Sequence, residues 1–359
     1  MSATRRVRIL HLITKLPYGG AQDNTLLSIA GLDRAVYDVD IASSPGGDWD
    51  ERARAVARQR LSLHQLQHQM APARDLLAIA ELVRLLRRER YDILHTHSSK
   101  AGLLGRIAGR VARVPLVIHT VHGFPFNDQT FSPRVRQLYL WLERLGARLS
   151  DQLIMVAELN RQEALARGVG RAEQMTVIHS GIDLTRFSAL PDQAEARRRL
   201  NLPTDAFVAG SIVRIAACNG PELLAETALT LVKRHPQLHF LIAGDGKLFP
   251  QLQSQLADQP RIHLLGYRDD VPDILAALDA FVSTNLWGGL GRSITEALAA
   301  GLPTVAFPVN GVPELIQPGK TGLHAPVGDA AALADQVSWI LAHPAAARQL
   351  GEKGRALVY

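Results

Sequence analysis

The stretch 91-YDILHTHSSKAGLLGRIAGRVARVPLVIHTVH-122 has the pattern of a strand, a helix and a second strand. Its ends, YDILHTH and LVIHTVH, are short runs rich in β-branched residues, and apolar residues recur at helical spacing between them. Two strands joined through a helix form a βαβ unit, whose strands lie parallel in one sheet. The same alternation continues in both directions along the chain, which predicts an α/β protein built on parallel sheets.

The strands and helices form two series, and each series predicts one Rossmann-like domain. Strands are predicted in the first series at RVRILHLI, YDVDIAS, YDILHTH, LVIHTVH, DQLIMVA and MTVIHSG, and in the second at AFVAGSIVRI, LHFLIAGDG, RIHLLGY, AFVSTN and PTVAFPV. We predict domains at 1–183 and 206–359, separated by a turn-rich linker at 184–205. Ligands of such sheets bind beyond the carboxyl ends of the strands, so we expect the site in a cleft between the two domains.

The composition is that of an ordinary globular protein, with 47% hydrophobic and 21% charged residues. A single cysteine, Cys218, excludes an internal disulfide framework and a zinc site built from cysteines. No apolar run approaches the roughly 18 residues of a membrane span. His11, Thr14 and Lys15 interrupt the apolar stretch near the amino terminus, which therefore does not resemble a signal peptide. We expect a cytoplasmic protein.

Positive charge is concentrated in the first half of the chain, where residues 1–180 carry 25 Lys and Arg against 17 Asp and Glu. No signature of an RNA-binding or zinc-finger module accompanies this charge, so no nucleic-acid partner is expected. In 132-SPRVRQLYLWLERLGARLS-150, arginines alternate with leucine, tyrosine and tryptophan at helical spacing, as in a helix lying on anionic lipid. The alternative is an amphipathic helix packed on the sheet. The first interpretation predicts peripheral contact with the inner face of the cytoplasmic membrane.

A second stretch, 285-NLWGGLGRSITEALAAGLP-303, places glycines in a loop that leads into an alanine-rich helix. Glycines allow close approach of a ligand, and the free N–H groups of a first helical turn can bind an anion. The alternative is a turn that only packs. Other loops predicted after strands are also polar and rich in glycine: 17-PYGGAQ-22, 119-HTVHGFPF-126, 214-RIAACNG-220, 244-GDG-246 and 266-GYRDD-270.

Six motifs in order carry a resemblance to a known enzyme family: GGAQ, HTVHGF, HSGIDLTRF, IAGDG, LLGYRDDV and GLGRSITEALAAGLPTVAFPVNGVPELI. The chain resembles the retaining glycosyltransferases of family 4, which have the GT-B fold of two Rossmann-like domains facing a cleft. HTHSSKAG followed by HTVHGFPF further resembles the branch that builds cell-surface polysaccharides and lipid-linked glycans. The resemblance implies sugar transfer from a nucleoside-diphosphate sugar to a glycan or lipid-linked acceptor, with retention of anomeric configuration and without a cofactor or metal ion.

The resemblance also implies roles for particular residues. Glu296 would accept hydrogen bonds from the ribose hydroxyls, and Arg214 would balance the charge of the leaving diphosphate. His122, the implied catalytic residue, would contact the donor sugar near the reaction centre. The other positions that match the donor-binding pattern are Gly19, Gly20, Tyr267, Arg268, Gly289, Leu290, Gly291, Arg292 and Ser293.

Two donor-binding positions depart from the family pattern. Gly288 stands where the family has a glutamate that contacts the donor sugar, and Asn219 stands where it has a lysine at the diphosphate. The end of the chain, 350-LGEKGRALVY-359, would also fall short of a final helix that crosses back to the amino-terminal domain in this family.

Two alternatives to an active glycosyltransferase stay open at this point. One is a catalytically impaired family member that binds a nucleotide-sugar or a partner without turnover, which Asn219 and Gly288 favour. The other is a nucleotide-sugar epimerase of the same architecture. A dehydrogenase is disfavoured because no G-x-G-x-x-G follows the first strand.

Histidines are frequent in two loops predicted after strands of the first domain, 95-HTHSSKAG-102 and 119-HTVHGFPF-126, at His95, His97, His119 and His122. Such a group raises the question of a metal ion. The two pairs belong to different strands, and the resembling family needs no metal, so we predict none.

Overall fold

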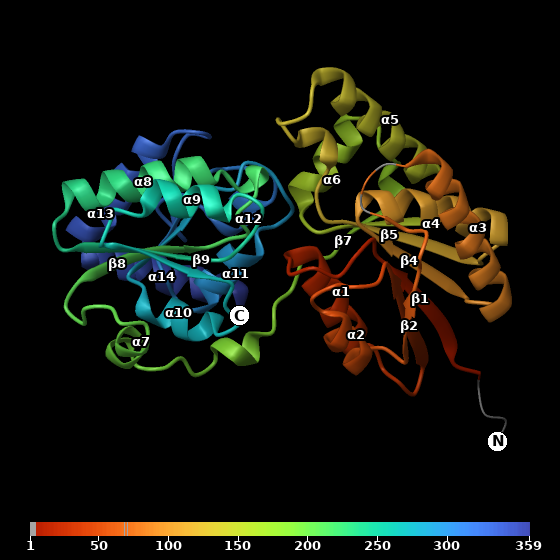
Figure 1. Ribbon diagram of the computed structural model, residues 1–359, viewed down its shortest axis with the longest axis horizontal. Coiled ribbons are helices and arrows are strands. Elements are labelled where there is room, and N and C mark those ends of the chain that lie inside the picture. Colours follow the sequence, from red (N-terminus) through yellow and green to blue (C-terminus); the bar gives the residue numbers. More distant parts are fainter. Residues whose placement is uncertain (1–4, 68, 70) are drawn as a thin grey trace. The chain divides into compact units, whose positions relative to one another are not determined.

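The computed structural model describes residues 5–67, 69 and 71–359, which form two compact units (Figure 1). Unit 1 ends at Gly181 and unit 2 begins at Ile182. Residues 1–4, part of the amino-terminal stretch discussed above, lie outside the described residues. Both units are α/β domains built on parallel sheets, as predicted, and each is described by itself.

Unit 1 contains a sheet of seven parallel strands in the order β3-β2-β1-β4-β5-β6-β7. The strands are β1 (Val7–Leu12), β2 (Tyr37–Ser43), β3 (Gln59–Ser62), β4 (Ile93–His97), β5 (Leu116–Val121), β6 (Gln152–Met155) and β7 (Met175–Val177). All were predicted except β3, whose sequence QRLS is short, polar and exposed at both ends. Successive strands are added on one side of β1 and then on the other, so the order reverses between β1 and β4.

Helices cover both faces of this sheet (Figure 1). They are α1 (Gly20–Ala30), α2 (Asp50–Val56), α3 (Pro72–Glu89), α4 (Ser99–Ala112), α5 (Pro133–Arg148) and α6 (Glu158–Ala166), with short 3₁₀ turns at η1 (Pro125–Asn127) and η2 (Ala172–Gln174). Leu10 and Leu12 of β1 pack in one core with α3 and α4, whereas Ile9 and Ile13 pack in another with α1 and α2. Because side chains alternate along a strand, His11 is directed to the same face as Ile9.

Unit 2 contains six parallel strands in the order β10-β9-β8-β11-β12-β13. They are β8 (Phe207–Ile212), β9 (Leu238–Ala243), β10 (Ile262–Gly266), β11 (Ala280–Ser283), β12 (Thr304–Ala306) and β13 (Leu323–His324). The sequence did not predict β13, which has only two residues. Here the strand order reverses between β8 and β11.

Helices also cover both faces of the second sheet, with α8, α9 and α13 on one face and α10, α11 and α14 on the other (Figure 1). The helices of unit 2 are α7 (Gln193–Arg199), α8 (Pro221–Arg234), α9 (Phe249–Leu256), α10 (Val271–Ala277), α11 (Arg292–Ala299), α12 (Val312–Leu315), α13 (Ala330–Ala342) and α14 (Pro344–Val358), with 3₁₀ turns at η3 (Leu184–Phe187) and η4 (Ala217–Asn219). The stretch predicted as a linker, 184–205, contains η3 and α7. Arg197 of α7 is buried and donates to the Ala277 carbonyl at 3.0 Å, which attaches this stretch to unit 2.

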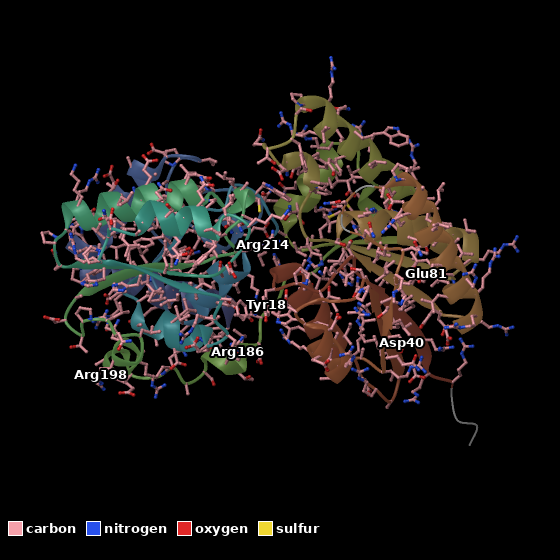
Figure 2. The ribbon with its side chains drawn as sticks, in the orientation of Figure 1. Tyr18, Asp40, Glu81, Arg186, Arg198 and Arg214 are labelled. Atoms are coloured by element: carbon pink, nitrogen blue, oxygen red, sulfur yellow. The ribbon has the colours of Figure 1, made fainter. Side chains whose placement is uncertain are left out.

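Asp40 of β2 organises the amino-terminal edge of the first sheet (Figure 2). Its buried carboxylate accepts hydrogen bonds from Arg58 Nε at 2.9 Å and from Tyr91 Oη at 2.7 Å. Burial and the bond to Asp40 raise the pKa of Tyr91 above its usual value. A charge this deep is stable only when it is paired and hydrogen-bonded, so these contacts hold the segments that enter β3 and β4 against β2.

Helix α5 has one packed face and one exposed face. Leu140 and Ala147 are buried in the core of unit 1, while the side chains of Leu138 and Trp141 are 48% and 56% exposed. The packed face agrees with an amphipathic helix on the sheet, and membrane contact through the exposed face stays a prediction. Among the described residues, no helix combines the length and the apolar character that a bilayer crossing requires.

Candidate functional site

The residues implied for donor binding in unit 2 lie at one edge of its sheet. Arg214 and Asn219 follow β8, Tyr267 and Arg268 follow β10, and the 288–296 segment follows β11. Parallel strands end at the same edge, and the strand order reverses between β8 and β11. Loops that follow the two strands at such a reversal turn to opposite faces of the sheet, and the space between them is where α/β sheets bind ligands.

Hydrogen bonds connect the loop after β8 to the loop after β11. Leu286 N donates to the Cys218 carbonyl at 2.9 Å, and Thr284 Oγ1 donates to the Asn219 carbonyl at 2.7 Å. Gly220 has φ of 59°, and a Cβ at this position would lie 2.7 Å from the Thr284 carbonyl oxygen. Only glycine satisfies both conditions, so Gly220 is required for the approach of the two loops.

Asn219 closes the loop in which Arg214 lies. Its side-chain Nδ2 donates to the Arg214 carbonyl at 2.6 Å. The Arg214 side chain is exposed (Figure 2), and among the described residues its guanidinium contacts only the Cys218 sulfur, at 3.8 Å. The loop therefore presents the exposed cation of Arg214. Asn219, at the position where the family pattern has a lysine, instead binds the backbone of the loop.

The 288–293 segment is held by the loop after β12. Asn310 Oδ1 accepts from Gly288 N at 2.8 Å, and the Gly289 carbonyl accepts from Gly311 N at 3.1 Å. A Cβ added to Gly288 would have no atom within 4 Å except those of Gly288 itself and its two chain neighbours. The position therefore has space for a longer side chain. Leu290 is buried and anchors the segment.

Helix α11 begins at Arg292, and its first backbone hydrogen bond runs from Thr295 N to the Gly291 carbonyl. The N–H groups of residues 292–294 have no intrahelical acceptor, as in the first turn of any helix. These donors and the helix dipole favour an anion at this end of α11.

Glu296 is the fifth residue of α11 and is almost completely buried, at 4% exposure. It is therefore not the exposed first-turn charge that a surface helix would carry. Arg292 Nε lies 2.9 Å from Glu296 Oε1, and this ion pair offsets part of the cost of burying the carboxylate. The pairing also orients the carboxylate.

The remaining predicted position of unit 2 is the turn after β10. Tyr267 is 40% exposed, and Arg268 forms an ion pair with Asp270, with Nε and Oδ1 2.7 Å apart. The hydrogen bond from Arg268 holds the pKa of Asp270 below its ordinary value. Tyr267 and Arg268 are both exposed at this turn.

The predicted residues of unit 1 also lie after strands. Gly19 precedes α1 and Gly20 is its first residue, so both follow β1 at a helix N-terminus. His122 follows β5 directly. The structure thus groups Gly19, Gly20 and His122 at the carboxyl edge of one sheet and the other predicted residues at the carboxyl edge of the second. The cleft between the domains remains a prediction.

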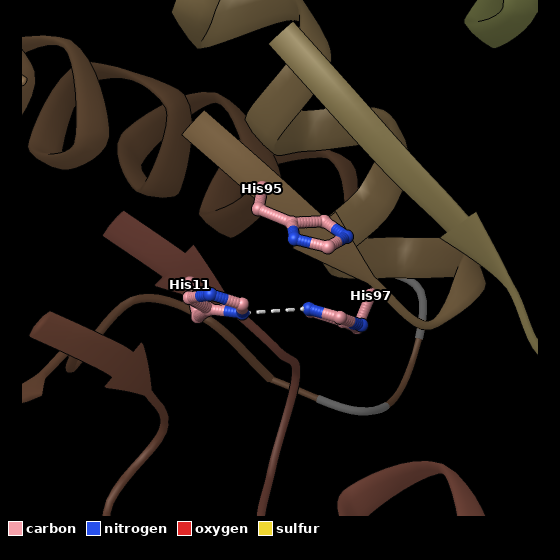
Figure 3. Close-up of side chains that lie close together, drawn as sticks. All are labelled: His11, His95 and His97. Carbon is pink, nitrogen blue, oxygen red and sulfur yellow. Dashed lines mark hydrogen bonds between the residues drawn. The ribbon is translucent and has the colours of Figure 1, made fainter. Parts of the chain in front are cut away.

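His122 is the end of a hydrogen-bonded chain of three histidines. His97 Nδ1 lies 3.2 Å from His122 Nε2, and His97 Nε2 lies 3.0 Å from His11 Nδ1 (Figure 3). His11 and His97 are buried, and His122 is partly buried. His95 lies beside the chain, with Nε2 2.7 Å from Thr120 Oγ1.

His119 does not belong to this chain, although the sequence places it with the other histidines. In the register of β4 and β5 it pairs with Thr96, and its Nδ1 lies 2.9 Å from Thr96 Oγ1. Side chains alternate between the two faces of a sheet, so Thr96 and His119 face away from His95 and His97.

Burial keeps these imidazoles neutral. It lowers the pKa of His11 to about 3 and that of His122 to about 4, and it places the pKa of His97 well below its ordinary value. Removal from water disfavours the charged form of a base, which is the cause of each shift.

His11, His95 and His97 offer ring nitrogens within 4.8 Å of one another, and they are the group with metal-ligand spacing found among the described residues. A zinc ion needs each ligand nitrogen at about 2.0 to 2.1 Å. Two of these nitrogens, His11 Nδ1 and His97 Nε2, are already hydrogen-bonded to each other, so an ion would have to break the chain. Independence from metal ions therefore stays our prediction.

Two contributors to these networks were not predicted. In the sequence, His11 interrupts an apolar run and Asn310 is one residue of a longer motif, and neither pattern predicts these contacts. A polar residue inside the first strand was the available signal for His11. For Asn310 the signal was an asparagine before glycine, a residue that tolerates the left-handed backbone found here, with φ of 46°.

Comparisons with known proteins agree with this arrangement. A model of the glycosyl transferase 4-like domain matches residues 19–181, and a model described as glycosyl transferases group 1 matches residues 206–343. The chain is 32% identical over 321 residues to the UDP-Gal:alpha-D-GlcNAc-diphosphoundecaprenol alpha-1,3-galactosyltransferase of Escherichia coli, a match that covers 86% of this chain and 81% of that protein.

Two further similarities extend over almost the whole chain. The capsular polysaccharide biosynthesis glycosyltransferase CapM of Staphylococcus aureus is 23% identical, with 98% of this chain and 92% of that protein covered. The crystal structure of Anabaena HepE in complex with UDP and glucose is similar with a TM-score of 0.82 at 23% identity, covering 98% of this chain and 95% of that one.

Two Rossmann-like domains with parallel sheets of this kind constitute the GT-B fold, and the protein is a glycosyltransferase. More specifically, the chain belongs to the group 1 glycosyltransferases.

The buried histidines make a prediction about acid stability. Their folded pKa values lie below the unfolded value of about 6.5, so between pH 6.5 and pH 4 the unfolded chain binds protons that the folded chain does not. The free energy of unfolding should therefore fall as pH falls through this window, by up to about 1.4 kcal/mol per pH unit for each buried histidine. The slope is measured by urea unfolding of the full chain at several pH values. Hydrogen exchange of peptides from β4 and β5 monitors the unfolding of unit 1.

Burial also lowers the pKa of His119 well below its ordinary value. His119→Gln therefore removes one of these titrating groups and should reduce the slope by one histidine's share. His64→Gln is the matched control, because His64 is exposed. Equal slopes in the wild type and His119→Gln would contradict the prediction.

Proposed function

We propose that the enzyme transfers a sugar from a nucleoside-diphosphate sugar to a lipid-linked glycan acceptor, as a retaining glycosyltransferase of family 4. The observation that carries the proposal is the similarity to the E. coli galactosyltransferase over 86% of the chain. The name of that enzyme specifies a UDP-sugar donor and an acceptor linked to diphosphoundecaprenol. The arrangement of the loops in unit 2 supports donor binding.

The diphosphate of the donor would lie between Arg214 and the first turn of α11. Arg214 is exposed and has no carboxylate partner among the described residues, so its charge is available to an anion. Negative charge grows on the diphosphate as the glycosidic bond breaks. A fixed cation and fixed N–H donors therefore stabilise the transition state more than the bound substrate.

The nucleoside would be held by the outer parts of the same edge. Glu296 offers carboxylate oxygens to the two ribose hydroxyls, a geometry that suits a vicinal diol, and Arg292 holds this carboxylate in place. The exposed ring of Tyr267, next to Arg268, would border the base.

In unit 1, the backbone at Gly19 and Gly20 would approach the diphosphate, because neither residue has a side chain of its own. His122 would contact the donor sugar. Its lowered pKa makes it a neutral hydrogen-bond partner at physiological pH and not a source of charge.

A second candidate function is donor binding without turnover, and two residues favour it. Gly288 lacks the carboxylate that would contact the sugar. Asn219 lacks a charge and is engaged with the Arg214 carbonyl, so Arg214 is left as the cation of this loop. Each missing charge-assisted hydrogen bond is worth about 1.5 to 3 kcal/mol, or about ten- to two-hundredfold in rate.

The acceptor side of the proposal includes peripheral attachment to the inner face of the cytoplasmic membrane. On α5, Leu138 and Trp141 are exposed one helical turn apart, and Arg134 and Arg148 lie on the same side toward the two ends. Apolar side chains flanked by arginines fit the boundary between lipid headgroups and acyl chains. Such attachment would bring the enzyme to a lipid-linked acceptor.

Arg214→Ala tests the donor site. Loss of the exposed cation of the loop after β8 should lower kcat/KM for the donor by about tenfold or more, with little change in thermal stability. A nucleotide-release assay over a panel of UDP- and GDP-sugars measures this effect, and the anomeric configuration of the product tests retention. Arg198→Ala is the control, because Arg198 lies on α7 in an exposed pair with Glu195 (Figure 2). Equal losses in both variants would contradict the assignment.

Gly288→Glu separates the active enzyme from the impaired one. The position is open, and its backbone is outside the left-handed region, so a glutamate can be accommodated. If the missing carboxylate limits turnover, the variant should release nucleotide about tenfold faster or more. Gly288→Leu supplies bulk without charge and should give no gain. Equal, readily measured rates in the wild type and Gly288→Glu would exclude impairment at this position.

Leu138→Ser/Trp141→Ser tests membrane attachment. Flotation with anionic liposomes should recover at least about tenfold less of this double variant, because each buried apolar side chain contributes about 1.5 to 3 kcal/mol. Binding of the wild type should weaken at high salt, which screens its arginines. Leu76→Ser/Leu77→Ser is the control, since both residues are exposed on α3. Wild-type binding that is equal at low and high salt, and equal with anionic and neutral liposomes, would contradict the proposal.

A further inference from the structure

The chain from His11 through His97 to His122 constrains the position of every proton in it. His97 uses both ring nitrogens, one toward His122 at 3.2 Å and one toward His11 at 3.0 Å. Each neutral imidazole carries one N–H donor and one acceptor nitrogen. Burial lowers the pKa values of all three, so the chain contains three N–H groups at neutral pH.

Only two proton arrangements satisfy both hydrogen bonds. If His97 donates from Nδ1 to His122, then His11 must donate from Nδ1 to His97, and the proton of His122 must be on Nδ1. If His97 donates from Nε2 to His11, then His122 must donate from Nε2, and its Nδ1 has a lone pair. The tautomer of His122 is thus coupled to that of a residue on another strand.

The outward-facing nitrogen of His122 is Nδ1, because Nε2 is directed at His97. To donate a hydrogen bond to the sugar, His122 must therefore carry its proton on Nδ1. The proton position of a histidine is set by the hydrogen bond that its other nitrogen makes. The arrangement that gives His122 this donor is the one in which both His11 and His97 donate from Nδ1.

We propose that His97 is a positioning residue that donates to Nε2 of His122 and thereby holds His122 as the Nδ1–H tautomer, with its N–H directed outward. The proposal rests on the proposed role of His122 at the donor sugar. His11 completes the chain by satisfying the second nitrogen of His97. The three residues come from β1, β4 and the end of β5, so the register of the central strands brings together the side chains that set the tautomer of His122.

A purely structural role for His97 makes different predictions for two variants. His97→Leu fills similar space but can neither donate nor accept. His97→Gln provides an amide N–H and a carbonyl oxygen, which can replace the two hydrogen bonds. His119→Leu is the matched control, because His119 is equally buried on the opposite face of the same sheet and bonds to Thr96.

The test uses the full chain labelled with ¹⁵N-histidine, with the His122 signals assigned from His122→Gln. Long-range ¹H–¹⁵N spectra at neutral pH should show a protonated Nδ1 and an unprotonated Nε2 for His122. His97→Leu should shift His122 to a mixture of tautomers or to Nε2–H and lower kcat about three- to tenfold with little change in donor KM, the loss expected for one hydrogen bond. His97→Gln should restore both the tautomer and kcat, and His119→Leu should leave the tautomer unchanged.

Two results would overturn the inference: an Nε2–H tautomer of His122 in the wild type, or an unchanged Nδ1–H tautomer in His97→Leu. Absence of turnover by the wild type with every donor would count against the proposed function. The tautomer measurement needs no turnover, so it decides the inference by itself in that case.

Discussion

Parallel pairing at the two points of strand-order reversal is the constraint on which the rest of the structure depends. In unit 1, β1 pairs with β4 so that His11 lies beside His95, and in unit 2, β8 pairs with β11 through Ala209 and Ala280. All strands of each sheet run in the same direction, so every candidate residue follows a strand at one edge. The hydrogen bonds between the loops after β8 and β11 then define the shape of the proposed donor site.

Two groups of buried polar side chains in unit 1 find hydrogen-bond partners within the interior. Asp40 is bound by Arg58 and Tyr91 at the amino-terminal edge of the first sheet, and the histidine chain lies toward the carboxyl edge. In the first group, a guanidinium and a hydroxyl donate hydrogen bonds to the carboxylate. The second group remains neutral because burial disfavours imidazolium. Hydrogen-bonded networks of this kind favour one packing arrangement over its alternatives.

The loops of the proposed donor site are held by specific backbone contacts. Gly220 permits the close approach of Thr284, and Asn310 Oδ1 accepts from the backbone N–H of Gly288. What differs is charge. Asn219 uses its amide to close the loop around Arg214, a structural contact, at the position where the family pattern has a lysine.

The sequence by itself determined the fold and the positions of the loops that follow the strands. Alternating apolar runs predicted six of the seven strands of unit 1 and five of the six of unit 2, and glycine-bearing loops followed them. It missed β3 and β13, because two to four residues with polar side chains have no detectable periodicity. It also led us to group His119 with His95 and His97.

Only the tertiary structure decided which side chains meet. His11 and His97 are 86 residues apart, and their contact depends on strand register and on the face to which each side chain points. Side-chain rotamers and packing decide that Glu296 is buried beside Arg292. They also decide that Asn219 is directed toward the Arg214 carbonyl. Periodicity along a chain describes which face of an element is buried. It does not describe the partner that each polar atom finds there, since that partner comes from a distant segment brought near by the sheet.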